Sequence, residues 1–168
     1  MIPFGHVVLV FLAVCTVFTE LKHGKIYNWL TIPAILTGLL LASFRGLGEL
    51  QGAFAGMVIG GGIFLIPYLM SGLATGRPVI GGGDVKFTAA VGSLTGVHFT
   101  LWVIYYGILI GAAIGFGTLA WKWAARRWGK REPGERGESL WLMKLPFGTA
   151  LATAVIIVLI QSNQAVSQ

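Results

Sequence analysis

The stretch AFAGMVIGGGIFLIPYLMS, residues 53–71, contains no charged side chain and is long enough to cross a lipid bilayer. A transmembrane helix needs roughly 20 predominantly apolar residues, because the hydrocarbon core is about 30 Å thick. The rest of the chain has the same character, since 55% of the 168 residues are hydrophobic, 11% are charged and the mean hydropathy is +0.80. The sequence therefore predicts an integral membrane protein that crosses the bilayer several times.

Five further apolar segments accompany this one, and we expect each of the six to be a membrane-spanning helix. The bilayer core cannot satisfy the open edges of a sheet, so the expected fold is all-α, a polytopic helical bundle forming one domain over residues 1–168. The first segment lacks a basic n-region and a small-residue cleavage site, which favours a span over a signal peptide. The expected spans are Ile2–Phe18, Trp29–Phe44, Ala53–Ser71, Val85–Phe99, Thr100–Trp123 and Leu145–Ile160.

The positions of the positive charges predict the orientation. Of the 12 Lys and Arg residues, all except Arg45 lie in or beside the loops that follow the first, third and fifth expected spans. Short loops rich in Lys and Arg stay in the cytoplasm, so both termini are expected on the outer, periplasmic side. A basic cytoplasmic loop is expected at about 124–144. The net charge of +6 then reflects topology and anionic lipid rather than a nucleic-acid partner.

Two acidic residues, Glu20 and Asp84, lie where an expected span meets a loop. Two crossings separate them, so both reach the same cytoplasmic end of the bundle. An ionisable group at the membrane edge marks a candidate functional site. Two carboxyl groups that share a partly desolvated site titrate as a pair, one protonated while the other is ionised. Aspartic proteases use this arrangement, in which one carboxylate activates a water and the other supplies a proton.

Both acids also have structural interpretations. Glu20 could pair with Lys22 or Lys25 at the interface, and Asp84 could cap the helix that follows it. The glycines 81–83 could form a plain turn, and they are not a phosphate loop because no Gly-Lys-Ser/Thr follows. Their lack of Cβ atoms would equally permit the close approach of an extended peptide.

Neither a metal nor a cofactor is expected. His6, His23 and His98 are scattered along the chain, and Cys15 is the single cysteine, so no metal-ligand spacing and no CxxC pair occurs. Small residues such as Gly56 and Gly60 in the third expected span favour close helix packing rather than ligand binding.

Three segments, in the same order, resemble the prepilin peptidases, which are integral-membrane aspartyl proteases. GGGDVKFTAAVG, residues 81–92, resembles their GxGD motif. ELKHGKIYNWLT, residues 20–31, resembles their first catalytic segment, usually D-x-x-x-x-[RK]-I-P-N-x-L-T, and KLPFGTALA, residues 144–152, resembles their terminal P-[YF]-G-P-A span. The short chain without paired CxxC motifs is similar to the compact form found in tight-adherence (Flp-type) pilus systems.

The resemblance implies an aspartic-type endopeptidase of the bacterial inner membrane. Such an enzyme cleaves the basic leader of prepilins or pseudopilins at the cytoplasmic face, without a cofactor, and works beside pilus or secretion assembly proteins. Nothing in the sequence indicates a methyltransferase site, so peptidase chemistry alone is expected. The resemblance assigns Asp84 and Glu20 as the catalytic residues, and Gly81, Gly83, Lys86, Asn28 and Pro146 as motif residues near the substrate.

This sequence departs from the family pattern at two positions. Glu20 stands where the family has an aspartate, and Tyr27 replaces the proline before Asn28. The additional methylene of Glu20 moves the carboxyl group by about 1 Å, and a displacement of that size can lower a rate about 10²-fold. The chain could be an active natural variant, an impaired member that binds prepilins without cleaving them, or a form with a deliberately introduced substitution.

Two functions of other classes fit the same features. A small ion-coupled transporter could use Glu20 and Asp84 as a cation or proton relay, and its activity would depend on an ion gradient. A non-catalytic scaffold could hold prepilins near a secretion motor, and it would tolerate replacement of Asp84 by Asn.

Overall fold

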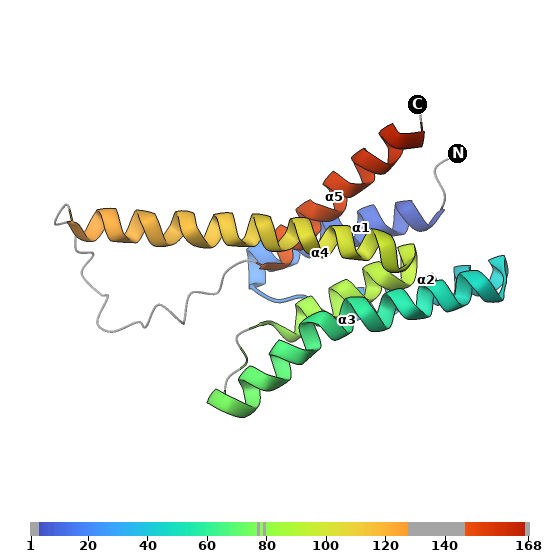
Figure 1. The fold of residues 1–168 in the computed structure, drawn as a ribbon, viewed down its shortest axis with the longest axis horizontal. Coiled ribbons are helices and arrows are strands. Elements are labelled where there is room, and N and C mark those ends of the chain that lie inside the picture. Colours follow the sequence, from blue (N-terminus) through green and yellow to red (C-terminus); the bar gives the residue numbers. More distant parts are fainter. Residues whose placement is uncertain (1–3, 77, 79, 128–146, 167–168) are drawn as a thin grey trace.

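The computed structural model describes residues 4–76, 78, 80–127 and 147–166. Four helices in this part of the chain, α1, α3, α4 and α5, are long and apolar enough to cross a membrane. The expected all-helical, polytopic membrane bundle is therefore confirmed. The helices are α1 (Phe4–His23), α2 (Asn28–Arg45), α3 (Leu47–Thr75), α4 (Gly82–Arg127) and α5 (Phe147–Val166), shown in Figure 1.

The described residues form five helices where six spans were expected, because the fourth and fifth expected spans are joined in α4. Gly96 interrupts α4 with φ of 78° and ψ of −175°, and the chain reverses its direction there (Figure 1). Glycine takes this positive φ without a steric penalty. The break divides α4 into a first arm, residues 82–95, and a second arm, residues 97–127, and it precedes the expected boundary at Phe99 by three residues.

The interior is apolar, and much of the outer surface is apolar too. Side chains such as Phe11, Leu36 and Met70 are each more than 60% exposed, a pattern that lipid rather than water accommodates. All five helices contribute side chains to the core. The largest fully buried apolar ones are Leu9, Leu12, Phe87, Val91, Val103, Leu151 and Val155.

The first arm of α4 packs against α3 with almost no side chain between the two backbones. A Cβ atom at Gly92 would collide with the carbonyl oxygen of Gly56, and one at Gly60 would lie 2.6 Å from the carbonyl oxygen of Thr88. Small residues allow helices in a membrane to approach this closely. The expected packing role of Gly56 and Gly60 is confirmed.

The two described ends of the chain lie at the same end of the bundle (Figure 1). Toward the other end, the last turn of α1 lies beside the start of α5, and the first arm of α4 begins nearby. This arrangement gives the site its position, because Glu20 is in the last turn of α1 and Asp84 in the first turn of α4. The basic loop expected at about 124–144 begins inside α4, which continues to Arg127, and the rest of that loop lies outside the described residues.

Candidate active site

Glu20 is held at the end of α1 by the start of α5. Its backbone carbonyl accepts a hydrogen bond of 2.7 Å from the N–H of Gly24, whose φ of 62° ends the helix. Its side-chain Oε1 accepts a hydrogen bond of 3.0 Å from the backbone N–H of Gly148, and the N–H of Thr149 also donates to the carboxyl group. The first N–H groups of a helix have no partner within the helix, so they form a ready site for a carboxylate.

Asp84 is almost completely buried, with 6% of its surface exposed. Its side chain accepts a hydrogen bond from the backbone N–H of Gly81, and its own N–H donates 3.0 Å to the carbonyl oxygen of Gly81. A Cβ atom at Gly81 would lie 3.0 Å from Oδ2 of Asp84, so glycine leaves room for the carboxyl group to fold back over this turn. Asp84 is thus the third residue of α4 and not its expected N-cap, and its carboxyl group stabilises the start of the helix by reaching back to Gly81.

The two carboxyl groups are close enough to interact electrostatically. Oε2 of Glu20 is buried and has no hydrogen-bond partner among the described residues. A carboxylate oxygen without a partner in a buried position is costly unless water or another molecule binds it. The expected meeting of Glu20 and Asp84 at one end of the bundle therefore occurs, with an acceptor atom available beside the pair.

Ile26 fills the space between the glycine loop and α5. A Cβ atom at Gly83 would lie 2.8 Å from Cβ of Ile26, and one at Gly148 would lie 2.7 Å from Cδ1 of Ile26 and 2.9 Å from Oε2 of Glu20. Gly83 and Gly148 therefore let Ile26 and Glu20 pack between the two helix starts. Neither Ile26 nor Gly148 was among the predicted site residues, although both lie inside the segments 20–31 and 144–152 that resemble the family motifs.

A second neighbour of the loop is Tyr68 of α3. Its ring lies 3.6 Å from the position that a Cβ atom would occupy at Gly82. Tyr68 is far from the quoted segments in the sequence, and no local pattern distinguishes it from the other aromatic residues of a membrane span. It is brought to the site by the packing of α3 against the first arm of α4.

Two of the expected motif residues contact each other. Nζ of Lys86 donates a hydrogen bond of 2.8 Å to Oδ1 of Asn28, which links the start of α2 to the first turns of α4. Both residues are exposed. Pro146, another expected motif residue, lies outside the described residues. Within the described ranges, no group of three or more His, Cys, Asp or Glu residues is placed to hold a metal ion.

Comparison with known proteins gives one consistent result. Residues 7–116 match the type IV leader peptidase family. The chain is 26% identical over 164 residues to a prepilin leader peptidase/N-methyltransferase of Bacillus subtilis, covering 98% of this chain and 58% of that protein. It is 28% identical over 148 residues to the leader peptidase HopD of Escherichia coli, covering 88% and 86% of the two chains.

A prepilin leader peptidase/N-methyltransferase of Aeromonas hydrophila is 30% identical over 111 residues, which are 66% of this chain and 38% of that protein. The chain thus spans between about two fifths and three fifths of the length of the first curated relatives that it matches. No solved structure matches it. The family match extends over more than half of the chain and includes both Glu20 and Asp84. The chain therefore belongs to the type IV leader peptidase family.

Proposed function

We propose that the chain is an aspartic-type endopeptidase that removes the basic leader from prepilins or pseudopilins. The observation that carries this proposal is the pair of half-buried Glu20 and buried Asp84, in which the buried Oε2 of Glu20 has no partner among the described residues. This oxygen is a suitable acceptor for a proton of the attacking water. Family membership, and the relatives named as leader peptidases, support the choice of a protein leader as the substrate.

In the proposed reaction one carboxyl group of the pair is ionised and the other carries a proton. The ionised group accepts a proton from a water as the water oxygen attacks the carbonyl carbon of the scissile peptide bond. The protonated group gives its proton to the carbonyl oxygen, which produces a neutral tetrahedral intermediate. As the intermediate collapses, the C–N bond breaks and the leaving nitrogen takes a proton from the group that first accepted one. The other carboxylate takes back the proton of one hydroxyl group, whose oxygen becomes the carbonyl oxygen of the product. The pair returns to its initial protonation state.

The neighbouring backbone suits an extended substrate. Gly81 is exposed and lies directly beside Asp84, and no side chain at this position blocks the approach of a peptide. Lys86 and Asn28 lie at the same end, where their hydrogen bond links the start of α2 to the first turns of α4. On the orientation that the positive charges predict, this end faces the cytoplasm, the side from which a basic leader would reach it.

The test is coexpression of the full chain with a candidate prepilin, with leader removal followed by gel shift and amino-terminal sequencing. The panel contains the chain itself, Glu20→Asp, Glu20→Gln and Asp84→Asn. Gln51→Ala is the control, because Gln51 is an exposed polar residue near the start of α3, at the other end of the bundle. We expect cleavage by the chain and by Gln51→Ala, and none by Asp84→Asn or Glu20→Gln.

The Glu20→Asp variant separates the explanations for the unusual glutamate. Cleavage by both the chain and Glu20→Asp identifies an active variant. Cleavage by Glu20→Asp alone identifies an impaired member of a competent family, and retention of uncleaved prepilin by the chain in a pull-down would then assign it a binding role. Cleavage by Asp84→Asn would falsify the assignment of the pair.

A further inference from the structure

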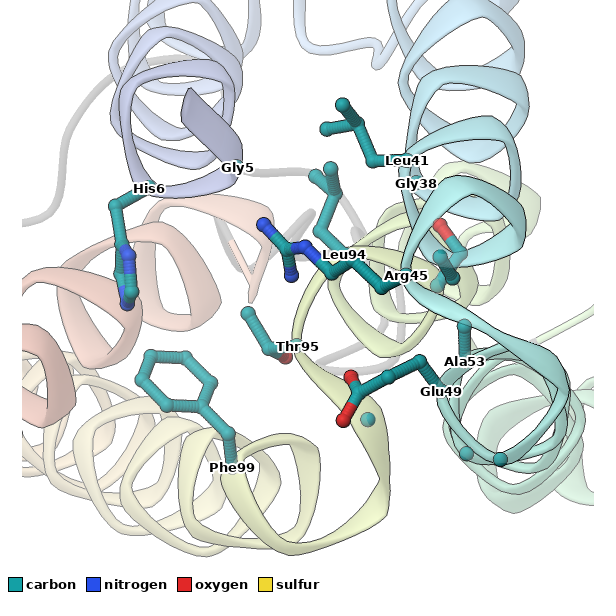
Figure 2. A pocket seen from close by; sticks show the side chains of 15 residues that line it. Gly5, His6, Gly38, Leu41, Arg45, Glu49, Ala53, Leu94, Thr95 and Phe99 are labelled. Carbon is teal, nitrogen blue, oxygen red and sulfur yellow. The ribbon is translucent and has the colours of Figure 1, made fainter. Parts of the chain in front are cut away.

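A cavity of about 280 Å³ lies at the opposite end of the bundle from the carboxyl pair. It opens where the starts of α1 and α3, the end of α2 and the break in α4 meet. Figure 2 shows its charged and aromatic lining residues. His6, which lines this cavity, and Glu20 lie 14 positions apart in the same helix, a distance of about 21 Å along the axis. The cavity is therefore a separate site.

The cavity contains groups that can bind both signs of charge. The guanidinium of Arg45 and the carboxylate of Glu49 both point into it, with open space between them (Figure 2). His6 lines the side of the cavity with its ring directed toward Phe99 (Figure 2), and its Nδ1 is buried without a hydrogen-bond partner among the described residues. A buried ring nitrogen without a partner indicates that water or a ligand supplies one. The three side chains together are complementary to a polar molecule that carries an anionic and a cationic group.

The broken backbone at Gly96 forms another wall of the cavity. The last carbonyl groups of the first arm and the first N–H groups of the second arm have no partners within their own helices. Irregular backbone at the level of a membrane is tolerated only where protein or a polar cavity surrounds it. The polar backbone groups at the break therefore favour a polar occupant of the cavity.

Aromatic residues next to the cavity indicate its depth in the membrane. Phe99 lines the cavity, and Trp102, Tyr105 and Tyr106 follow it on the second arm, with the rings of Trp102 and Tyr106 stacked at 6.0 Å between centroids. Trp102 is 45% exposed and Tyr105 53% exposed. Exposed Trp and Tyr residues gather at the level of the lipid headgroups. The cavity thus opens at the depth where phosphate and amine groups of phospholipids lie.

We propose that this cavity binds the headgroup of a zwitterionic phospholipid with a primary amine, as in phosphatidylethanolamine. Arg45 binds the phosphate, Glu49 accepts hydrogen bonds from the ammonium group, and His6 contributes a further polar contact. The volume is just below the range of about 300–1,000 Å³ that is typical of sites for drug-sized ligands, which suits a headgroup whose acyl chains stay in the bilayer. The position of the cavity, across the bundle from Glu20 and Asp84, makes this binding independent of the peptidase chemistry.

The test is native mass spectrometry of the full chain in detergent, with equal amounts of dioleoyl phosphatidylethanolamine, phosphatidylcholine and phosphatidylglycerol. We expect phosphatidylethanolamine to bind about tenfold more tightly than phosphatidylcholine, whose quaternary ammonium cannot donate a hydrogen bond to Glu49. Soluble glycerophosphoethanolamine, added as a separate probe, should bind far more weakly than the lipid. Equal affinity for phosphatidylethanolamine and phosphatidylcholine would overturn the proposal. So would an affinity for glycerophosphoethanolamine equal to that for phosphatidylethanolamine.

Variants assign the two charges separately. Arg45→Gln should weaken the binding of both phosphatidylethanolamine and phosphatidylglycerol by about tenfold. Glu49→Gln should remove only the preference for phosphatidylethanolamine over phosphatidylcholine. Arg45→Lys should keep most of the binding, which guards against a folding defect at this position. Arg127→Gln, which removes an exposed cation that lies over the ring of Trp123 at the end of the second arm, is the matched control and should bind as the parent does. Unchanged binding by both Arg45→Gln and Glu49→Gln would contradict the assignment.

Discussion

The backbone N–H of Gly148 donates a hydrogen bond of 3.0 Å to Oε1 of Glu20, which joins two residues that are 128 positions apart in the sequence. The start of α5 thereby fixes the direction of the Glu20 carboxyl group. One carboxyl oxygen is occupied by this bond, and the other, Oε2, has no partner in the described part of the chain. The helix that follows the long basic segment thus takes part in building the site.

Replacing Gly148 by alanine should displace Glu20. The added Cβ atom would lie 2.9 Å from Oε2 of Glu20 and 2.7 Å from Cδ1 of Ile26, so both side chains would have to move. We expect kcat/KM for leader cleavage to fall about 10-fold to 100-fold, since misplacing a catalytic group by about 1 Å has effects of this size. Gly62→Ala in α3 is the control, because a Cβ atom there meets nothing within 4 Å, and an equal loss in both variants would contradict the explanation.

Cleavage should show a bell-shaped dependence on pH. The proposed reaction needs one protonated and one ionised carboxyl group, so kcat/KM should fall when both are protonated and again when both are ionised. Initial rates with a purified prepilin between pH 4 and about 9 would measure the profile. Gln51→Ala, at an exposed position at the other end of the bundle, should leave the shape of the profile unchanged. A flat profile would contradict a mechanism that uses the pair of carboxyl groups.

Replacing Gly92 by alanine should destabilise the bundle without contacting the carboxyl pair. The new Cβ atom would collide with the backbone carbonyl of Gly56, and a backbone atom cannot move aside as a flexible side chain can. Overpacking of this kind costs about 1–3 kcal/mol. Thermal unfolding in detergent would measure the loss. Gly72→Ala, at a position of α3 with nothing within 4 Å of the added Cβ, should unfold at the temperature of the parent or slightly above it.

The hydrogen bond between Lys86 and Asn28 should contribute little to global stability. Both groups are exposed, and polar links between exposed side chains contribute about 0–1 kcal/mol. We expect Lys86→Met, Asn28→Ala and the double variant to show almost the same small loss, because either single change already removes the bond. Unfolding measurements on the two single variants and the double variant give the coupling free energy between Lys86 and Asn28. Strictly additive losses of stability would show that the two residues act independently.

Composition alone was enough to predict the class of fold. Long apolar segments cannot leave their backbone groups unpaired in lipid, so an all-helical bundle was the expected result, and it is confirmed. The number of separate helices could not be predicted in the same way. A hydropathy profile averages the hydrophobicity of side chains along the sequence and carries no information on backbone angles. The break at Gly96 depends on the backbone conformation of that residue and on the packing of the first arm against α3.

The sequence also determined which acids belong together, because Glu20 and Asp84 are separated by two crossings and must reach the same end of the bundle. Only the tertiary structure decided how their carboxyl groups are held, through the N–H groups of Gly148 and Thr149 for one and of Gly81 for the other. The same holds for the cavity lined by Arg45 and Glu49 at the other end. Crossings can be counted along a chain, but hydrogen bonds and cavities form between helices whose angles and depths are set by packing.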